Sequence, residues 1–327
     1  MLIEFVTDVD LNFLHFFAGR LNVPVIDNRL EIPSSLGEGF VRWIDIDTDF
    51  RMLVHRYRLK EELVLRRIGT KEPTTFVSII FYSNEEPFTL IADHQQKQVF
   101  TRYNDLAVQI FSNTLDSTIT FPANSEIYFT VVAIRAANLG PLLRMSKPDP
   151  LIQTIINSKD SYLFYESMSP EAQITLKEIS EPKEESGLTN FFYRVKVESL
   201  LLYVFSQLHN RQSLRHNPIN KADVEKLFII RTEILNDLSV QPSLPQLAKT
   251  AGFSETKMKD LFRQVFGNSI YSYYQNARME EAAFLLKSKG YSVSETGYAL
   301  GFTNLSHFTR LFERHHLQKP KKYSAGA

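Results

Sequence analysis

The amino-acid sequence predicts a multidomain α+β protein, with a β-rich N-terminal part and an all-α C-terminal part that holds two helix-turn-helix units. Three observations lead to this prediction. The chain has 327 residues, which is more than one typical hydrophobic core needs. Short runs of Val, Ile, Phe and Tyr, separated by turn-forming residues, fill 40–136, as in an all-β barrel or sandwich. Beyond about 141 the pattern is helical, and two similar segments follow each other near the C-terminus.

The N-terminal part is predicted to form one helix followed by six strands. Leu11, Leu14, Phe17 and Leu21 recur at helical spacing. The strands are predicted from the runs VRWIDID, FRMLVHRYRL, TTFVSIIFY, LAVQIF, TITF and IYFTVVAIRA. Turn-forming pieces such as GTKEPT and NTLDS separate these runs, which favours antiparallel strands around one core.

Helices are predicted between this β-rich part and the C-terminal domain. Asp-Pro at 149–150 and Ser-Pro at 169–170 each supply an N-cap followed by Pro at the first helical position. A long helix is then predicted over 188–210. Its apolar run Leu200–Phe205 covers every side, so we expect neighbours on more than one side. We predict that this run forms much of a homodimer interface; the alternative is that it packs only within its own chain. The polar segment 211–220 is the predicted inter-domain linker.

The C-terminal region contains an internal repeat. The segment SLPQLAKTAGF is followed 49 residues later by SVSETGYALGF. Gly252 and Gly301 are each placed to end a helix with positive φ, and Ser254 and Thr303 then open a second helix. A helix, a glycine turn and a helix with a polar outer face form the helix-turn-helix unit, whose second helix enters a DNA major groove.

A single helix is predicted to join the two units. It extends from about Ser269 to Ser288 and stops at Gly290. Twenty residues at about 1.5 Å each span roughly 30 Å, and successive major-groove faces on one side of B-DNA lie about 34 Å apart. The joining helix therefore has a suitable length to place both second helices in adjacent grooves.

Charge and composition restrict the possible functions. The segment 241–327 holds 12 Lys and Arg against 6 Asp and Glu, whereas the whole chain holds 37 of each, so the C-terminal part suits a polyanion. The chain has no cysteine, which excludes disulfides, thiolate zinc sites and thiol nucleophiles. The N-terminus lacks a secretory-signal pattern, and no apolar run has the length of a membrane helix. We therefore expect a cytoplasmic protein.

Residues 223–323 resemble the DNA-binding domain of the AraC/XylS family of bacterial transcription regulators. The resemblance lies in LAKTAGFSETKMKDLFRQVFG, ARMEEAAFLL and VSETGYALGFTNLSHFTRLFERHHLQKPKKY. Three residues depart from the family pattern: Leu317 stands where Gly is usual, Lys319 where Thr is usual and Ser324 where Arg is usual. The segments IPSSLGEGFVRWIDID and ANSEIYFTVVAI more faintly resemble the siderophore-regulator-like branch of the family.

The resemblance implies a sequence-specific DNA-binding transcription regulator of the activator type. It implies a cupin-like β-barrel sensing domain over 1–140, a helical connector and dimerisation region over 141–220, and the DNA-binding domain over 221–327. The implied partners are double-stranded promoter DNA, RNA polymerase, a small-molecule effector in the barrel and a second copy of the chain. No cofactor, metal or membrane partner is expected. The alternative is a constitutive DNA-binding regulator or scaffold that senses no ligand.

The family's positions, carried over one by one, predict DNA contacts on the outer faces of both second helices. Thr256, Lys259 and Asp260 would approach base edges in the first, and Leu305 and Ser306 in the second. Lysine can donate to guanine, whereas aspartate accepts from the amino group of cytosine. The other predicted contacts are Glu255, Lys257, Arg263, Asn304, His307, Thr309 and Arg310, of which the Lys and Arg residues suit phosphates.

The strand FRMLVHRYRL supplies candidate ligand-binding residues in the N-terminal part. Its alternation places His55 and Tyr57 on one face, and Arg56 and Arg58 on the other. His55 and Tyr57 are thus candidates to line a polar cavity. Histidines in this half stand alone, without a His-x-His pair, which argues against metal-dependent enzymes. The lack of cysteine excludes the alkylation-repair fusion of this DNA-binding fold, and no catalytic residue is predicted.

Overall fold

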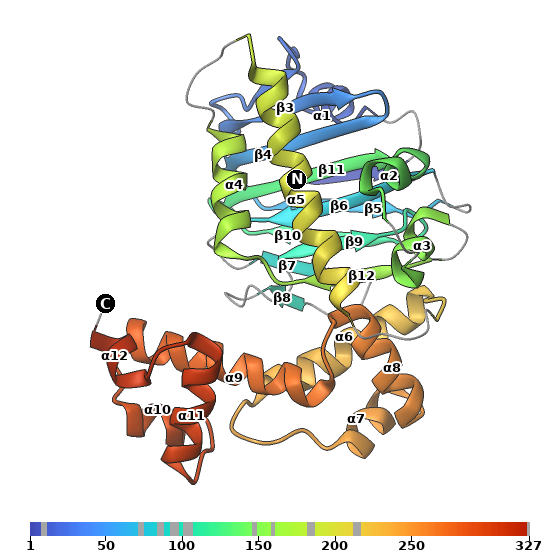
Figure 1. The fold of residues 1–327 in the computed structure, drawn as a ribbon. Coiled ribbons are helices and arrows are strands. Elements are labelled where there is room, and N and C mark those ends of the chain that lie inside the picture. Colours follow the sequence, from blue (N-terminus) through green and yellow to red (C-terminus); the bar gives the residue numbers. More distant parts are fainter. Residues whose placement is uncertain are drawn as a thin grey trace. The chain divides into compact units, whose positions relative to one another are not determined.

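Two units make up the chain in the computed structural model, Met1–Glu225 and Lys226–Ala327 (Figure 1). The structure describes residues 1–7, 12–70, 75–83, 88–91, 98–100, 107–145, 149–157, 161–181, 187–211 and 217–325. Half of the predicted inter-domain linker, 212–216, lies outside the described residues. Each unit is therefore described by itself.

The first unit contains two β-sheets. One has the order β1-β5-β10-β7-β8, in which β1 and β5 are parallel and the other pairs antiparallel. The other has the order β12-β9-β6-β11-β4-β3-β2 and is antiparallel throughout. The strands are β1 (Leu2–Val6), β2 (Arg29–Glu31), β3 (Gly37–Asp47), β4 (Phe50–Leu59), β5 (Leu63–Ile68), β6 (Phe76–Tyr82), β7 (Phe88–Ile91), β8 (Gln98–Phe100), β9 (Val108–Phe111), β10 (Ser117–Phe121), β11 (Glu126–Arg135) and β12 (Leu163–Glu166). Among these described strands, none of one sheet pairs with the other, so the predicted cupin-like fold is built from two sheets rather than a closed barrel.

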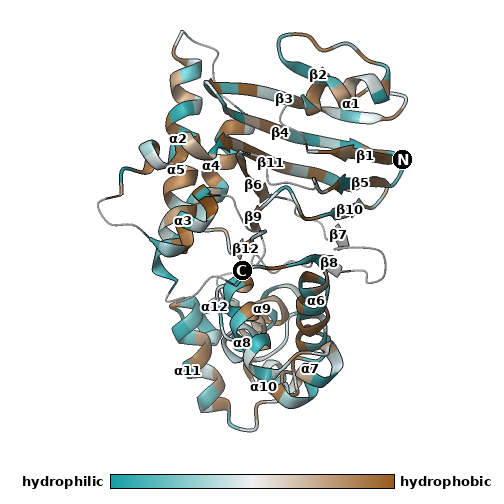
Figure 2. Cartoon of the chain, turned by 90° about the vertical axis from the view of Figure 1, so that its right-hand side faces the viewer, coloured by the Kyte–Doolittle hydropathy of each residue, from teal (hydrophilic) through white to brown (hydrophobic). Residues whose placement is uncertain are grey.

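Alternation along the central strands gives the seven-stranded sheet two apolar faces. On β4, Met52 and Val54 join the core beneath the helices. Leu53 and His55 point the other way and line a cavity, together with side chains of the five-stranded sheet. Both faces are buried, because helices cover one and the five-stranded sheet covers the other (Figure 2).

Four helices cover the outer face of the seven-stranded sheet (Figure 2). They are α2 (Ala136–Leu143), α3 (Pro150–Asn157), α4 (Pro170–Ser180) and α5 (Thr189–Asn210), while α1 (Phe13–Leu21) precedes β2. The stretch NLGP, expected to be a turn, lies inside α2. The strand β12 interrupts the region expected to be wholly helical, because its aromatic run LFYE pairs with β9. The other helices of this region are as predicted.

The apolar run of α5 packs against its own sheet. Leu200, Leu201, Val204 and Phe205 are at most 4% exposed and belong to the core beneath the helices. For these four residues packing within the chain is correct. The prediction that the run forms much of a homodimer interface is therefore wrong, because Leu201 and Phe205 are unavailable to a partner.

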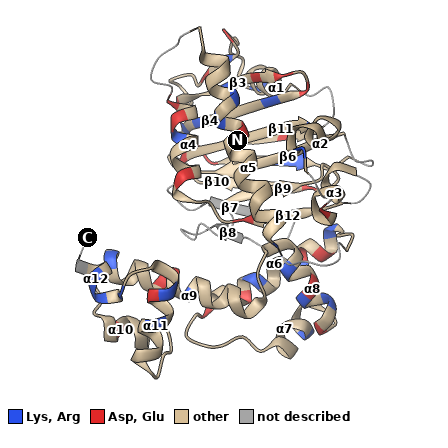
Figure 3. Cartoon of the chain, in the orientation of Figure 1, with Lys and Arg blue, Asp and Glu red and all other residues tan. Residues whose placement is uncertain are grey.

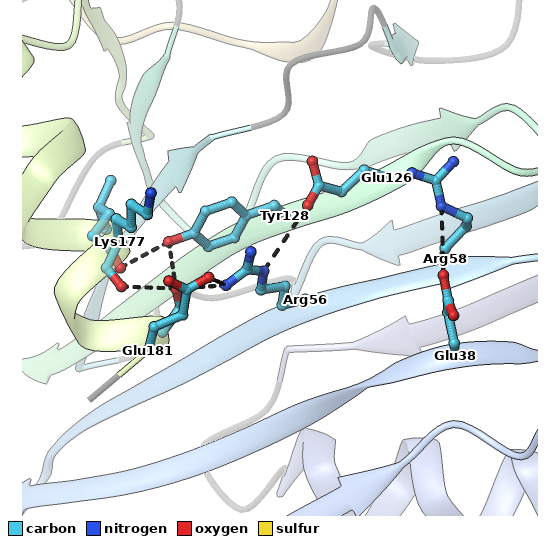
Figure 4. A network of polar contacts seen from close by, with 9 residues as sticks. Glu38, Arg56, Arg58, Glu126, Tyr128, Lys177 and Glu181 are labelled. Carbon is cyan, nitrogen blue, oxygen red and sulfur yellow. Dashed lines mark hydrogen bonds and ion pairs between the residues drawn. The ribbon is translucent and has the colours of Figure 1, made fainter. Parts of the chain in front are cut away.

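Polar contacts hold the C-terminal end of α4 to β4 and β11 (Figure 4). The Arg56 guanidinium donates to Glu181 and, over 3.3 Å, to the Ser180 hydroxyl. The Tyr128 hydroxyl donates to the Leu176 carbonyl at 2.7 Å. The hydrogen bond from Arg56 also lowers the pKa of Glu181. Arg56 thus lies on the helix-covered face, as alternation predicted, and has a structural role there.

The second unit is all helical. Its helices are the greater part of α6 (Lys221–Asn236), then α7 (Leu244–Ala251), α8 (Glu255–Phe266), α9 (Ile270–Ser288), α10 (Val293–Ala299), α11 (Leu305–His316) and α12 (Pro320–Ala325). Arg231 of α6 donates from Nε to the Tyr273 hydroxyl of α9 at 2.6 Å, in a buried contact. The Phe228 and Phe266 rings meet edge to face at 5.8 Å. The helix α6 therefore braces the first half of the unit. Every described helix of the chain is too short or too polar to cross a bilayer.

Candidate nucleic-acid interface

The first helix-turn-helix unit consists of α7, a glycine turn and α8. Gly252 ends α7 with φ 63°, and its N–H donates to the Ala248 and Lys249 carbonyls. The Ser254 hydroxyl then accepts from the Lys257 N–H at 3.3 Å and caps α8. Because glycine adopts this left-handed conformation without steric cost, the tight turn can hold the two helices at their angle. These two positions are as the sequence predicts.

The second helix-turn-helix unit, α10 to α11, repeats this arrangement with one difference. Gly301 has φ 74°, and a Cβ at Gly297 would lie 2.5 Å from Leu305 Cδ2, which explains the small residue where the helices cross. The predicted N-cap at Thr303 is wrong, because the Asn304 side chain caps α11 and accepts from the His307 N–H at 3.0 Å. The cap therefore lies one residue later than expected.

The helix α9 joins the two units. It has 19 residues, so it spans about 28 Å at roughly 1.5 Å per residue. The helix starts where it was expected to start, and the Ser269 hydroxyl caps it by accepting from the Ser272 N–H at 3.1 Å. Met279, Ala282 and Leu286 bury its later half in the hydrophobic core of the second helix-turn-helix unit. Both helix-turn-helix units therefore pack on one rigid element.

The outer face of α8 presents most of the predicted DNA contacts. Met258, Leu261 and Phe262 are at most 1% exposed and form the inner face. Thr256, Lys257, Lys259, Asp260 and Arg263 are exposed, and Glu255 is half-buried. The Lys259 Nζ lies 3.0 Å from Glu255 Oε2 and forms an ion pair along the helix. Binding to a base through Lys259 would have to break or share this pair.

The outer face of α11 is more mixed. Ser306, His307 and Arg310 are exposed, and Thr309 is half-buried. Asn304 is exposed but its side chain serves as the N-cap. Leu305 is half-buried, because its Cδ2 packs where Gly297 leaves room. The structure therefore brings all twelve predicted contacts onto the two helix faces, with Asn304 and Leu305 already engaged within the protein.

Basic side chains gather on the second unit. Figure 3 shows Lys and Arg on α8 and α12. The Lys257 ammonium lies 5.3 Å from the centre of the Phe253 ring, so a cation–π contact orients it beside the turn. Cations beside the N-terminal end of a helix, where backbone N–H groups are unpaired, suit a phosphate group.

A cluster of Glu280, His315 and His316 connects α11 with α9. His315 Nε2 lies 2.7 Å from Glu280 Oε1, and His316 Nε2 lies 3.0 Å from the Met279 carbonyl. Burial raises the pKa of Glu280, but the hydrogen bond from His315 and the charges of both histidines outweigh it, so the net shift is downward. Burial lowers the pKa of His316. The ligand atoms of these three side chains lie within 4.8 Å of one another and could hold a metal. Their hydrogen bonds, however, already explain their positions, because they join α11 to α9.

The two predicted ligand residues of the first unit occupy different places. His55 is 1% exposed and lines a cavity of about 150 Å³ between the sheets. Burial lowers its pKa to about 3, so the ring is neutral at pH 7. Tyr57 is 3% exposed, burial raises its pKa, and it does not belong to the cavity lining.

One residue of the cavity lining, Arg67, was not predicted from the sequence. It lies on β5, whose run LVLRRI was not among the predicted strands. Two adjacent arginines suggest a solvated segment, yet Leu63, Leu65 and Arg67 alternate on one buried face. That alternation is the signal that could have identified the strand.

Comparisons with known proteins give a family match in the C-terminal part and similarity to known regulators over part of the chain. Residues 247–326 match a family model described as a helix-turn-helix domain. The chain is 26% identical over 137 residues to the transcriptional activator AggR of Escherichia coli, covering 39% of this chain and 48% of AggR. It is 34% identical over 74 residues to the HTH-type transcriptional regulator GlxA of Rhizobium meliloti, covering 23% of each chain. In both cases the match spans less than half the length of the relative.

A solved structure adds a weaker likeness. Apo ToxT from Vibrio cholerae covers 85% of this chain and 97% of its own chain, at 15% identity and a TM-score of 0.36. A score of this size does not establish a common fold.

Proposed function

We propose that this chain, whose C-terminal part is a helix-turn-helix domain of the AraC type, is a sequence-specific DNA-binding transcription regulator. The observation that carries the proposal is the doubled unit, with α8 and α11 each following a glycine turn and each presenting a polar face. The joining helix, at about 28 Å, is comparable to the roughly 34 Å between successive major-groove faces. Two transcription regulators are similar to part of this chain.

Within this proposal the exposed side chains divide into two groups. Thr256, Lys259 and Asp260 read base edges from α8, and Ser306 does so from α11. Lys257, Arg263 and Arg310 set the register on the phosphates. His307 and Thr309 add hydrogen bonds at the rim, and Glu255 lies at the edge of the contact, paired with Lys259. Asn304 and Leu305 contribute through the cap and the packing that place α11.

The test uses the full chain and fragmented genomic DNA. Fragments retained by the protein should share one motif, and the affinity for that motif should fall steeply as salt rises, because phosphate contacts release counterions. The variant Lys259→Ala with Arg310→Ala should lose this enrichment while keeping its melting temperature, since both side chains are exposed. Enrichment of no common motif, or an affinity independent of salt, would contradict the proposal.

The N-terminal unit supports a regulator that responds to a small-molecule effector. The cavity between its sheets is lined by aromatic side chains and a few polar groups, as ligand sites are. The alternative, a constitutive regulator that senses no ligand, predicts that no small molecule alters DNA binding. The proposal also places the protein in the cytoplasm with its DNA, and an activator would contact RNA polymerase there.

A homodimer is proposed through the outer face of α5. Phe191, Val195 and Leu202 are 64%, 47% and 68% exposed, and their spacing of four and seven residues places them on one stripe. Leu188 continues this stripe just before the helix and is 68% exposed. Such an apolar stripe is typical of a helix that packs against a partner. Pairing two DNA-binding domains raises the effective concentration of the second for its half of the site.

A further inference from the structure

The cavity of the first unit has apolar walls from both sheets. Phe5 and Ile119 come from the five-stranded sheet, and Leu53, Val131 and Phe129 come from the seven-stranded sheet. Its volume is about 150 Å³, similar to an engineered cavity of about this size that accepts benzene. The cavity therefore suits a body of roughly six to ten non-hydrogen atoms.

One side chain of the cavity is a buried cation without a counter-ion. Arg67 is 6% exposed. Its Nε donates to the Ser117 hydroxyl at 3.1 Å, and its guanidinium lies 3.7 Å from the centre of the Phe111 ring. Its Nη1 has no hydrogen-bond partner. In the part of the chain that the structure describes, the Arg67 side chain forms no ion pair with a carboxylate.

The carboxylate whose charge acts on Arg67 is engaged elsewhere. Asp116 acts on Arg67 through its charge, and its effect on the pKa of Arg67 is smaller than that of burial. Its Oδ1 accepts from the Gly69 N–H at 2.6 Å, and its Oδ2 pairs with Lys221 at 3.0 Å. Burial lowers the pKa of Arg67 to about 10, which leaves it charged at pH 7. Because a buried charge is costly unless it is paired, this cation requires an anion that the described chain does not supply.

A second polar group of the cavity also lacks a partner. His55 stacks on Phe129 with ring centres 4.0 Å apart, and its Nδ1 is buried without a hydrogen bond. Since the imidazole is neutral at pH 7, it offers one hydrogen bond and no charge. The cavity thus combines one unpaired cation, one neutral hydrogen-bonding ring and apolar walls.

We infer that the cavity binds a small monocarboxylate with an apolar body, and that Arg67 is the residue that holds its carboxylate. A planar guanidinium matches a carboxylate with two parallel hydrogen bonds. A phosphate monoester would bring a second negative charge. The other arginine of the lining, Arg51, stacks on the Trp43 and Phe76 rings and is acted on by the charges of two acids, so it is less available than Arg67 to hold that charge. A sugar would leave several hydroxyls unpaired against the apolar walls. As an effector site, the inference rests on the proposed function; as a binding site, it stands on the cavity alone.

The test titrates the full chain with benzoate, isovalerate, benzyl alcohol and phenyl phosphate, and follows melting temperature and heat of binding. We expect the two carboxylates to bind and to raise the melting temperature, and the alcohol and the phosphate to bind at least about tenfold more weakly. Arg67→Gln should abolish the preference for carboxylates. Arg66→Gln is the matched control, since Arg66 is the next residue on β5, faces away from the cavity and pairs with Glu4 at 3.1 Å.

A second variant guards against misfolding. Arg67→Met should raise the melting temperature of the ligand-free chain, because it removes an unpaired buried charge, whereas loss of a merely structural arginine would lower it. Equal binding of benzoate and benzyl alcohol, or equal effects of Arg66→Gln and Arg67→Gln, would overturn the inference. Carboxylate binding without enrichment of any DNA motif would leave the inference standing and contradict the proposed function. Enrichment of a DNA motif without carboxylate binding would support the proposed function and overturn the inference.

Discussion

At the scale of single residues, the exposed Leu317 carries an avoidable backbone strain. It ends α11 with φ 55° and ψ 17°, and it is 90% exposed. This is the position where the resembled family usually has glycine. A side chain in the left-handed region costs about 1–2 kcal/mol, and no contact of Leu317 in the described structure offsets it.

Leu317→Gly should therefore stabilise the second unit. We expect the free energy of unfolding to rise by about 0.5–1 kcal/mol, since the greater freedom of glycine in the unfolded chain offsets part of the relief. Chemical denaturation of the full chain measures it. Leu317→Ala keeps the Cβ and serves as the control, and an equal gain for both variants would show that the backbone conformation is not the cause.

Lys259 and Arg310 should differ in what they contribute to DNA binding. Lys259→Ala should relax discrimination at one or two base pairs by about 1–3 kcal/mol, because a donor to guanine is lost. Arg310→Ala should weaken all sites about equally, as a phosphate contact does. Binding to a library of single-base variants of the selected site separates the two. A uniform loss for both would show that Lys259 does not read a base, and Lys289→Ala, beyond the end of α9, is the inert control.

At the scale of elements, the turn of the second helix-turn-helix unit depends on close backbone contact as well as on φ. A Cβ at Gly301 would lie 2.0 Å from the Ser239 carbonyl oxygen, whereas a Cβ at Gly290, with a similar φ of 68°, meets nothing within 4 Å. Gly290→Ala should cost about 1–2 kcal/mol from the backbone alone. Gly301→Ala should cost clearly more and should also weaken DNA binding, as measured by denaturation and by affinity. Equal costs would rule out the clash.

The outer stripe of α5 should govern self-association. Leu202→Glu and Phe191→Glu should shift the chain toward monomer in sedimentation while it remains folded, because both side chains are exposed. Leu201→Glu, at a position 1% exposed, should instead unfold the first unit by burying an unpaired charge. A wild type that is monomeric at tens of micromolar, with and without DNA, would contradict the dimer.

At the scale of the whole molecule, the two units should respond differently to acid. The folded pKa of His55, about 3, lies below the ordinary value near 6.5, so the unfolded chain binds one more proton between these values. Because of His55 alone, the free energy of unfolding of the first unit should therefore fall by about 1.4 kcal/mol per pH unit as the pH drops from 6.5 toward 3. In calorimetry, His55→Phe should flatten the pH dependence of one transition. The exposed His15→Phe should leave it unchanged, and a slope unaffected by His55→Phe would refute the assignment.

The sequence predicted most of the second unit and less of the first. Gly252, Gly301 and Ser269 act locally, through φ or a cap, and so could be read directly. Thr303 failed as a cap because its neighbour Asn304 can cap equally well, and only packing decides between them. Arg67 was missed because its burial depends on strands that come from distant parts of the chain. The apolar run of α5 was identified, but a helical pattern alone does not say which surface covers it.

The contact between Ser239 and Gly301 has a consequence for promoters. The segment before α7 lies against the turn before α11, and the Tyr274 hydroxyl of α9 donates to the Leu238 carbonyl beside it at 3.2 Å. These contacts hold the two DNA-reading helices, α8 and α11, in a fixed orientation relative to each other. Each inserted base pair would rotate one half of a target by about 34–36° and shift it by about 3.4 Å. Regulatory DNA recognised by two helices held in this way should tolerate base substitutions between its two halves far better than the gain or loss of a single base pair.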